Sequence, residues 1–258
     1  MKSFREFKDK IRFVLTDIDD TLTLDGKLPA GAYQALWHLK DHGVHVIPIT
    51  GRPAGWCEMI ARLWPVEGIV GENGAFYFRY KNKKMLRTFA IDLAERESNE
   101  TKLNAIRDEI LAQIPGTAVA SDQFCRINDL AIDFCEDVPA LPAADVKKIV
   151  SVFQKHGATA KVSSIHVNGW FGKCDKLSTS LLLLKNEFGL SDSEILKQCA
   201  FVGDSPNDEP MFSHFPFSFG VANIRHFISE LSRPPVFVSD SEGGSGFEEI
   251  ASQIIRNG

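Results

Sequence analysis

The 258-residue chain lacks most of the features that assign a sequence to a class at first sight. Its five cysteines are scattered and never spaced C-x-x-C, so they fit reduced thiols better than a disulfide framework or a zinc site. No apolar run reaches the roughly 20 residues that span a bilayer, and the charged segment 1–10 does not have the pattern of a signal peptide. A net charge of −5 argues against general nucleic-acid binding. These absences predict a cytoplasmic protein without membrane or nucleic-acid partners.

The most informative stretch begins with an apolar segment at 11–15. Three carboxylates, Asp17, Asp19 and Asp20, follow this segment. Desolvating a carboxylate is costly, so a buried strand does not carry acids at its tip without a compensating partner. In open α/β sheets, ligands bind at the carboxyl ends of the strands. Asp17 and Asp19 therefore predict a cation or phosphate site, and Asp20 is interpreted as the cap of a turn. The alternative is that all three acids belong to an ordinary acidic turn.

Two further apolar strands and one helix carry polar motifs at their ends. The strand at 46–49 runs into Thr-Gly-Arg at 50–52, and the strand at 201–202 runs into Gly-Asp-Ser-Pro-Asn-Asp at 203–208. A helix expected at 176–188 opens on a lysine. Each motif is weak evidence by itself, but the combination of motifs is specific.

Strands and helices alternate over most of the chain, which indicates right-handed βαβ units and a parallel sheet. With 44% hydrophobic residues, the chain can bury one large core or two modest ones. The elements expected before this alternation is interrupted are 12–16, 31–42, 44–50, 54–63 and 68–71. Those expected after the interruption are 176–188, 200–203, 207–213, 217–221, 225–231, 236–238 and 246–255, the last one following a glycine-rich loop at 243–246.

After the first part, a hairpin is expected from 75–80 and 84–89. From about residue 82 to 170 the strand–helix alternation stops, and the elements expected there are a helix at 101–114, a strand at 130–134, a helix at 143–155 and a strand at 161–167. Such a set predicts a compact α+β unit inserted into the α/β core. The boundaries are placed at 1–81 and 171–258 for the core and at 82–170 for the insertion.

The Asp-x-Asp, Thr-Gly-Arg, helix-opening lysine and Gly-Asp-x-x-x-Asp motifs together resemble those of the haloacid dehalogenase (HAD) superfamily of phosphatases. The resemblance covers roughly 10–80 and 171–258. The insertion resembles the C2-type cap of subfamily IIB, which includes sucrose-phosphate, mannosyl-phosphoglycerate and Cof-type phosphatases. Gly-Glu-Asn-Gly at 71–74 is similar to the turn that precedes such caps. The resemblance implies a Rossmann-like core with a parallel sheet, and a cap that closes over the active site.

The resemblance also implies an aspartyl-phosphate mechanism for a phosphoric monoester hydrolase. Asp17 matches the nucleophile, and Asp19 matches the general acid and base that protonates the leaving oxygen and later deprotonates water. Thr50 and the Gly51 amide are expected to hold a phosphoryl oxygen, although Thr50 is also suited to cap a helix. Arg52 is expected either to bind phosphate or substrate, or to be solvated at the start of the helix.

The lysine and the acids of the last motif complete the expected site. Lys176 fits the family pattern better than Lys173, although Leu177 replaces the usual glycine after the lysine. Asn207 is expected to hold this lysine or a phosphoryl oxygen. The implied ligands of Mg²⁺ are the Asp17 carboxylate, the Asp19 backbone carbonyl and Asp204. Asp208 is expected either to ligate Mg²⁺ through water or to orient the lysine.

The charge of these residues makes a cation necessary. Four carboxylates against one lysine leave three uncompensated negative charges when all are ionised, and a dianionic phosphate would be repelled. Mg²⁺ would remove two of these charges, and a protonated Asp19 would remove the third. Electrostatics and resemblance therefore both predict a magnesium site.

Substrate specificity is expected to come from the insertion. If its last strand alternates regularly, Ser164, His166 and Asn168 share one face. Arg126 and Lys161 are further candidates for binding an anionic or polyhydroxyl substrate. The alternative in each case is a structural or solvent-exposed histidine and solvated basic side chains.

Three functions are compatible with the sequence. The first is a Mg²⁺-dependent phosphatase for a small phosphorylated metabolite, a sugar phosphate or a phosphoglycerate-type ester, acting as a monomer or homodimer. The second is a sugar phosphomutase of the phosphomannomutase type, whose bisphosphate intermediate needs a strongly basic cap pocket. The third is a non-enzymatic metal-binding or interaction domain, against which the complete set of motifs argues.

Overall fold

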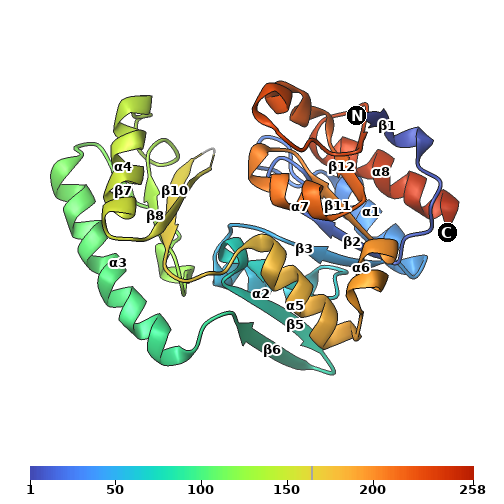
Figure 1. Ribbon diagram of the computed structural model, residues 1–258, viewed down its shortest axis with the longest axis horizontal. Helices are drawn as coiled ribbons and strands as arrows, with labels where there is room; N and C mark the ends of the chain where they lie inside the picture. The colour runs from blue at the N-terminus through green and yellow to red at the C-terminus, as the bar shows by residue number, and fades with distance from the viewer. Residues whose placement is uncertain (164) are drawn as a thin grey trace.

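A computed structural model describes residues 1–163 and 165–258 of the chain. Figure 1 shows a larger body of secondary structure at the right and a smaller one at the left. The larger body contains a six-stranded sheet in the order β1-β13-β12-β11-β2-β3, with parallel pairing throughout. Its strands are β1 (Lys2–Ser3), β2 (Phe13–Thr16), β3 (His45–Pro48), β11 (Cys199–Gly203), β12 (Phe217–Gly220) and β13 (Phe237–Val238). The predicted α/β core with a parallel sheet is confirmed.

Helices cover both faces of this sheet. They are α1 (Ala30–Asp41), α2 (Ala54–Leu63) and α8 (Gly243–Asn257) on one face, and α5 (Lys176–Phe188), α6 (Asp192–Gln198) and α7 (Glu209–His214) on the other. Successive side chains of a strand point to opposite faces, so Val14 of β2 lies in the first core, whereas Phe13 and Leu15 lie in the second. An apolar strand is therefore buried on both sides. Among the described helices, none is both long and apolar enough to cross a membrane.

A three-stranded antiparallel sheet extends the core beyond β3. A single parallel bridge joins the chain after β3 to β4 (Ile69–Gly71), which pairs with β5 (Phe76–Lys81), which in turn pairs with β6 (Lys84–Phe89). The two loop residues of this hairpin, Asn82 and Lys83, have φ values of 52° and 61°. Tight two-residue turns require such positive φ values. The hairpin expected from the sequence is confirmed.

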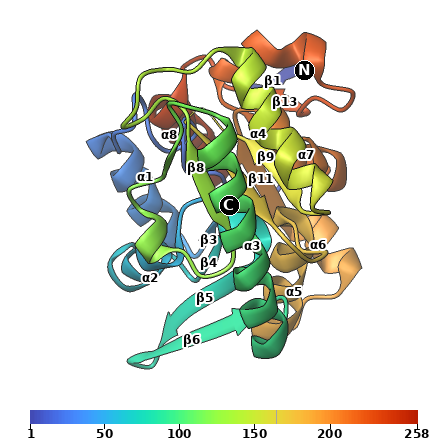
Figure 2. The same ribbon diagram turned by 90° about the vertical axis from the view of Figure 1, so that its left-hand side faces the viewer.

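The smaller body is the inserted α+β unit, called the cap below. Its elements are α3 (Leu93–Gln113), β7 (Ala118–Val119), β8 (Leu130–Asp133), α4 (Ala143–Lys155), β9 (Thr159–Val162) and β10 (His166–Trp170). The four strands form an antiparallel sheet in the order β7-β8-β10-β9, and Figures 1 and 2 show α3 and α4 on the face that points away from the core. Ile106, Ile149 and Phe153 fill the space between these helices and the sheet.

Two predictions for the cap are wrong in detail. The strand expected at 161–167 is in fact two antiparallel strands, β9 and β10, so Lys161 does not share a strand with His166 and Asn168. The helix expected at 101–114 begins at Leu93 instead, because the Asp92 carboxylate accepts a backbone amide of the first turn and caps the helix there.

The core also departs from the predictions. α6 and β1 lie where no element was expected, and the helix predicted at 225–231 is a 3₁₀ segment, η5 (Ala222–Glu230). The helix predicted at 207–213 is η4 (Pro206–Asp208) followed by α7. The glycine-rich segment at 243–246 is the first turn of α8 rather than a loop. It packs too closely for side chains: a Cβ on Gly244 would lie 2.6 Å from the Leu22 carbonyl oxygen.

Candidate active site

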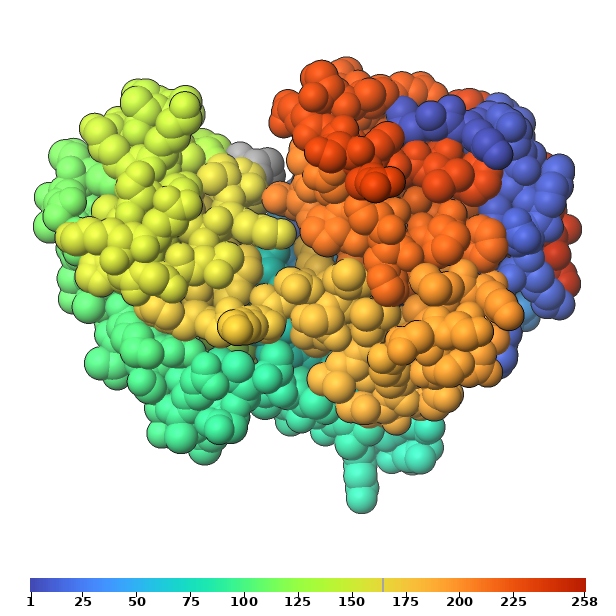
Figure 3. All heavy atoms as spheres, viewed as in Figure 1, coloured from blue at the N-terminus to red at the C-terminus, as the bar shows by residue number. Residues whose placement is uncertain are grey.

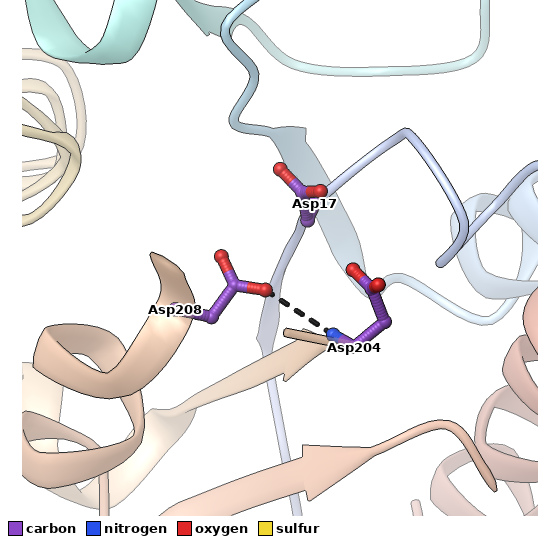
Figure 4. Close-up of side chains that lie close together, drawn as sticks. All are labelled: Asp17, Asp204 and Asp208. Atoms are coloured by element: carbon purple, nitrogen blue, oxygen red, sulfur yellow. Dashed lines mark hydrogen bonds between the residues drawn. The ribbon is translucent and has the colours of Figure 1, made fainter. Parts of the chain in front are cut away.

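The acids that follow β2 and β11 meet at one edge of the core sheet. Asp17 comes directly after β2, and Asp204 comes directly after its parallel neighbour β11. The Asp17 amide donates to the Val202 carbonyl at 2.9 Å, which holds the two strand ends together. Asp208 joins them from η4, where its carboxylate accepts the Asp204 amide at 3.2 Å. Figure 4 shows the three carboxylates side by side, and one oxygen of each lies within 4.8 Å of the others.

The Lys176 ammonium group contacts this acidic cluster. Asp175 caps α5 by accepting a backbone amide of its first turn, and Lys176 begins the helix. Lys176 Nζ lies 2.7 Å from Asp17 Oδ1 and 3.1 Å from Asp208 Oδ1. Burial lowers the pKa of Lys176, but the two carboxylates outweigh burial and raise it, so the side chain stays protonated. Lys173 is exposed, so it is Lys176 that the fold brings to the acids.

The carboxylates outnumber the ammonium, and their pKa values reflect this. Burial raises the pKa of Asp17 to about 7 and that of Asp204 to about 9, and neighbouring acids add to both shifts. The Thr21 hydroxyl donates to Asp204 Oδ1 at 3.0 Å. Converging, buried carboxylate oxygens with too little positive charge around them are the donor set that suits a hard divalent cation.

The Thr-Gly-Arg motif forms the loop between β3 and α2. Thr50 is fully buried, and its hydroxyl accepts the Arg52 amide at 3.0 Å. The alternative that Thr50 caps α2 is wrong, because the helix begins after Pro53 and its N-cap makes no side-chain hydrogen bond. The contact of Thr50 and the Gly51 amide with a phosphoryl oxygen stays a prediction.

Arg52 is bound to the expected general acid. Its Nε lies 3.1 Å from both carboxylate oxygens of Asp19, and its Nη2 lies 2.8 Å from Oδ1. The guanidinium also lies over the Trp56 ring, 4.8 Å from the centroid. Because a guanidinium fork is rigid and planar, this contact fixes the orientation of the Asp19 carboxylate.

The strand ends open into a cavity of about 710 Å³ between the core and the cap. Figure 3 shows the hollow between these two bodies at the surface of the molecule. The lining joins Asp17, Asp19 and Lys176 of the core to His166 and Asn168 of the cap. All predicted site residues line it except Thr50 and Asp208, which are fully buried.

The polar side chains of β10 are engaged with acids of the cap. Asn168 donates to Asp129 Oδ2 at 3.0 Å. His166 Nε2 lies 2.9 Å from Glu136 Oε2, and burial lowers the pKa of the histidine. Ser164, which was expected on the same face, lies outside the described residues. Both described residues line the cavity, and their contact with substrate stays a prediction.

The two basic candidates of the cap differ in their surroundings. The Arg126 side chain is only 2% exposed, pairs with two cap carboxylates, and donates to the Gly51 carbonyl at 3.1 Å. The Lys161 side chain lines the cavity and forms no ion pair or hydrogen bond with the described residues, and burial lowers its pKa. Asn207 donates to the Val162 carbonyl of the cap at 3.4 Å, and its expected contact with lysine or phosphate stays a prediction.

Comparisons with known proteins bear on this geometry. Residues 14–111 match the model of the haloacid dehalogenase-like hydrolases. The match covers less than half of the 258-residue chain. It includes β2 and its carboxylates, the Thr-Gly-Arg loop, and the hairpin that leads into the cap. None of the curated proteins matches this chain.

Solved structures share the fold of this chain. A Thermoplasma acidophilum protein aligns with a TM-score of 0.76 and 19% identity, over 96% of this chain and all of its own. A HAD/COF-like hydrolase from Plasmodium vivax aligns with a TM-score of 0.72 and 18% identity, over 98% of each chain. The sucrose-phosphatase of Synechocystis, solved with sucrose and phosphate, aligns with a TM-score of 0.63 and 15% identity, over 95% of this chain and 98% of its own. At these identities the likeness shows a common fold, a Rossmann-like core with a cap.

Sequence motifs missed two residues of the chain that support the site. Thr21 lies in the same acidic stretch as Asp17 and Asp19, but only the fold shows that its hydroxyl reaches Asp204. Glu72 lies in the turn after β4, and its carboxylate is fully buried among backbone amides. For Glu72, the available sequence signal was an acidic residue in a turn between two apolar strands.

Proposed function

We propose that this protein is a Mg²⁺-dependent phosphatase that acts on a small phosphorylated metabolite through an aspartyl-phosphate intermediate. The observation that carries the proposal is the Asp17 carboxylate, which is held by the Lys176 ammonium at 2.7 Å and opens into the cavity under the cap. Phosphate monoesters hydrolyse so slowly that a nucleophile, a proton donor and charge stabilisation must all be supplied. Asp17, Asp19 and Lys176 line one cavity and can supply them.

In the first step, the Asp17 oxygen that does not bind Lys176 attacks phosphorus. The new bond forms as the bond between phosphorus and the leaving oxygen breaks, and Asp19 transfers its proton to that oxygen. The products are a free alcohol and a phosphoryl group on Asp17. Lys176 offsets negative charge on the phosphoryl oxygens while the geometry at phosphorus inverts.

In the second step, the ionised Asp19 takes a proton from a water molecule whose oxygen attacks phosphorus. The bond between phosphorus and the Asp17 oxygen breaks, inorganic phosphate leaves, and Asp19 is again protonated. The bidentate contact with Arg52 holds the ionised Asp19. In the first step, release of one of these bonds lets the protonated Asp19 turn toward the leaving oxygen, while the other bond keeps it oriented. The freed N–H group can then donate to a phosphoryl oxygen.

The acidic cluster is the proposed magnesium site. When bound, Mg²⁺ would supply the positive charge that the carboxylates and the phosphate dianion lack. Asp17 and Asp204 would offer carboxylate oxygens, and the Asp19 backbone carbonyl would complete the protein ligands. Asp208 already bonds to Lys176 and to the Asp204 amide, which suits an outer role through water.

The cavity favours a substrate with one phosphate and a polar remainder, such as a sugar phosphate or a phosphoglycerate-type ester. Its lining includes Asp25, Glu230 and Glu242, acids outside the catalytic cluster that disfavour a second dianionic group. Lys161 lines the cavity and has no ion-pair partner among the described residues, so its ammonium can bind a hydroxyl-rich or carboxylate group of the substrate. A phosphomutase must rebind a bisphosphate, and a cap whose Arg126 is already neutralised suits that reaction poorly. The cavity therefore supports a phosphatase better than a mutase.

The test is phosphate release from a panel of sugar phosphates, phosphoglycolate, glycosyl-phosphoglycerates and nucleotides, with either Mg²⁺ or EDTA. We expect turnover with Mg²⁺ on a single-phosphate substrate, and none with the Asp17→Asn variant. Acid-labile phosphate trapped on Asp17 would identify the intermediate. Strict dependence of product formation on a sugar bisphosphate activator would instead establish the mutase, and the absence of release and of trapped phosphate would contradict the proposal.

A further inference from the structure

Glu72 is a buried acid with no part in the proposed chemistry. It follows β4 in the turn η2 (Glu72–Gly74), and its side chain is inaccessible to solvent. Glu72 and the next residue, Asn73, have φ values of 44° and 55°. Residues other than glycine seldom adopt this left-handed conformation unless their surroundings hold them in it. The turn directs the carboxylate to the junction between α2 and a loop of the cap, 126–129.

The carboxylate of Glu72 accepts four backbone hydrogen bonds. Oε1 accepts the Ala54 amide at 3.0 Å and the Ile127 amide at 2.9 Å. Oε2 accepts the Asn128 amide at 2.7 Å and the Asp129 amide at 3.2 Å. The first donor is the first residue of α2 in the core, and the other three are consecutive residues of the cap. One side chain therefore joins the two bodies.

These neighbours fit the ionised form of Glu72. All four are donors, so a proton on either oxygen would face N–H groups instead of an acceptor. Burial and the nearby Asp129 carboxylate raise the pKa of Glu72 to about 8, and the amides of Ile127 and Asn128 act against that rise. No basic side chain among the described residues forms an ion pair with Glu72, so backbone amides provide its compensation, with the start of α2 adding its helix dipole.

The cap loop that Glu72 holds also contacts the Thr-Gly-Arg loop of the core. Arg126 precedes the three amides and donates to the Gly51 carbonyl at 3.1 Å. Asp129 accepts from Arg126, and also from Asn168 on the cavity wall. A shift of this loop would therefore move both the Gly51 contact and the wall of the cavity.

We propose that Glu72 is a positioning residue that sets the cap against the core. Its carboxylate clamps the loop 126–129 to the start of α2 and so places the wall formed by β9 and β10 over Asp17. Loss of the clamp loosens the cap without removing a group that touches phosphate. The consequence for catalysis rests on the proposed function: a substrate that fills the cavity binds more weakly, whereas a substrate too small to reach the cap is little affected.

Hydrogen exchange tests the clamp without any assay of activity. The side chain in Glu72→Gln keeps the size of glutamate but turns an NH₂ group toward amide donors. We expect the amides of 127–129 to exchange about tenfold faster or more, with the amides of β2 and β11 unchanged. Glu249→Gln is the matched control, because Glu249 also accepts two backbone amides, but within the core. Unchanged exchange at 127–129 in Glu72→Gln would overturn the proposal, and so would an equal acceleration throughout the chain.

Kinetics separate positioning from chemistry. For the best substrate of the panel, we expect Glu72→Gln to raise KM about tenfold with little change in kcat. For acetyl phosphate, which is too small to reach the cap, kcat/KM should change less than about threefold. An equal loss for both substrates would contradict a positioning role. If the unaltered hydrolase releases phosphate from neither compound, the proposed function fails, while hydrogen exchange still decides whether Glu72 is the clamp.

Discussion

Lys176 and Asp17 form a buried ion pair, with 2.7 Å between Nζ and Oδ1, although they are 159 positions apart in the chain. The pair joins the start of α5 to the end of β2, and its ammonium also bonds to Asp208 at 3.1 Å. The contact leaves one oxygen of Asp17 for attack on phosphorus. A single cation thus orients the nucleophile and partly neutralises the acids around it.

Replacing Lys176 by methionine should impair both activity and stability. The change leaves three buried acids without their cation, and loss of one partner of a buried ion pair costs about 3–5 kcal/mol. We expect kcat to fall about 100-fold or more. Thermal denaturation in EDTA should show a lower Tm, and Mg²⁺ should raise the Tm of this variant more than that of the unaltered protein. Lys185→Met, on the exposed side of the same helix, should change neither quantity. A kcat within threefold of the original would contradict the role of Lys176.

Exchanging Arg52 for lysine should lower kcat although the charge is kept. Lysine cannot make the bidentate contact that Arg52 makes with both oxygens of Asp19, so the proton donor would lose its fixed orientation. General acid catalysis contributes about 100-fold or more, and we expect at least a tenfold loss of it. Steady-state kinetics with Arg62→Lys, an exchange in the exposed pair with Glu58, provide the control. Equal kcat values for the two variants would show that the Asp19 contact is dispensable.

The metal-free protein should lose stability as the pH rises. The pKa of Asp17 is raised from 3.8 to about 7 and that of Asp204 to about 9, so the folded state prefers the protonated acids. Their contribution is complete below the pKa of about 4 in the unfolded chain and is lost as the pH rises through 7 and 9. Thermal denaturation in EDTA should therefore give a lower Tm at pH 9 than at pH 5.

Mg²⁺ should counteract this loss, because it binds the ionised acids and competes with protons. Its stabilising effect should increase between pH 6 and 9, and calorimetry should detect proton release on binding. The control is Asp204→Asn, in which the pH dependence of the Tm in EDTA should be smaller. A pH dependence that is identical in this variant would mean that other groups cause it.

The Lys161→Met variant should bind its substrate more weakly. Lys161 is a cation on the cavity wall without a partner among the described residues, so it is free to bind the part of the substrate beyond the phosphate. Removing it should raise KM about tenfold and leave kcat nearly unchanged. Lys148→Met, in an exposed pair on α4, is the control. An unchanged KM for the best substrate would exclude Lys161 from substrate binding.

Gly74→Ala should destabilise the fold more than Gly157→Ala. Both glycines have positive φ, 106° and 77°, so alanine is strained at either position by about 1–2 kcal/mol. A Cβ at Gly157 meets open space, whereas one at Gly74 would collide with the Asp175 carbonyl at the start of α5. Chemical denaturation measures the difference. Equal losses in the free energy of unfolding would show that the contact with α5 relaxes freely.

Local patterns were sufficient for the acids at the strand ends. An apolar segment that is buried on both faces and then ends in carboxylates is a local signal, and parallel strands bring their carboxyl ends to one edge. The positions of Asp17 and Asp204 at one edge followed from this rule. Lys176 opens a helix, so it was assigned by resemblance to the HAD motifs, and the fold shows it beside Asp17. The strand expected at 161–167 was wrong, because a residue pattern does not mark where one short strand ends and the next begins. β9 and β10 are both short and lie close together in the sequence, so the pattern continues from one to the other.

The amino-acid sequence alone was enough to predict a parallel α/β core, an inserted α+β unit and an acidic edge, because hydrophobic periodicity and strand-end motifs are written in neighbouring residues. The partners of the side chains depended on the tertiary structure. Arg52 could have bound solvent or phosphate, and only the packed loop shows its fork on Asp19. Three of the four backbone amides that donate to Glu72 belong to residues that lie 55, 56 and 57 positions after it in the chain. A backbone amide is the same in almost every residue, so no sequence pattern marks it, and folding alone brings these amides to one carboxylate.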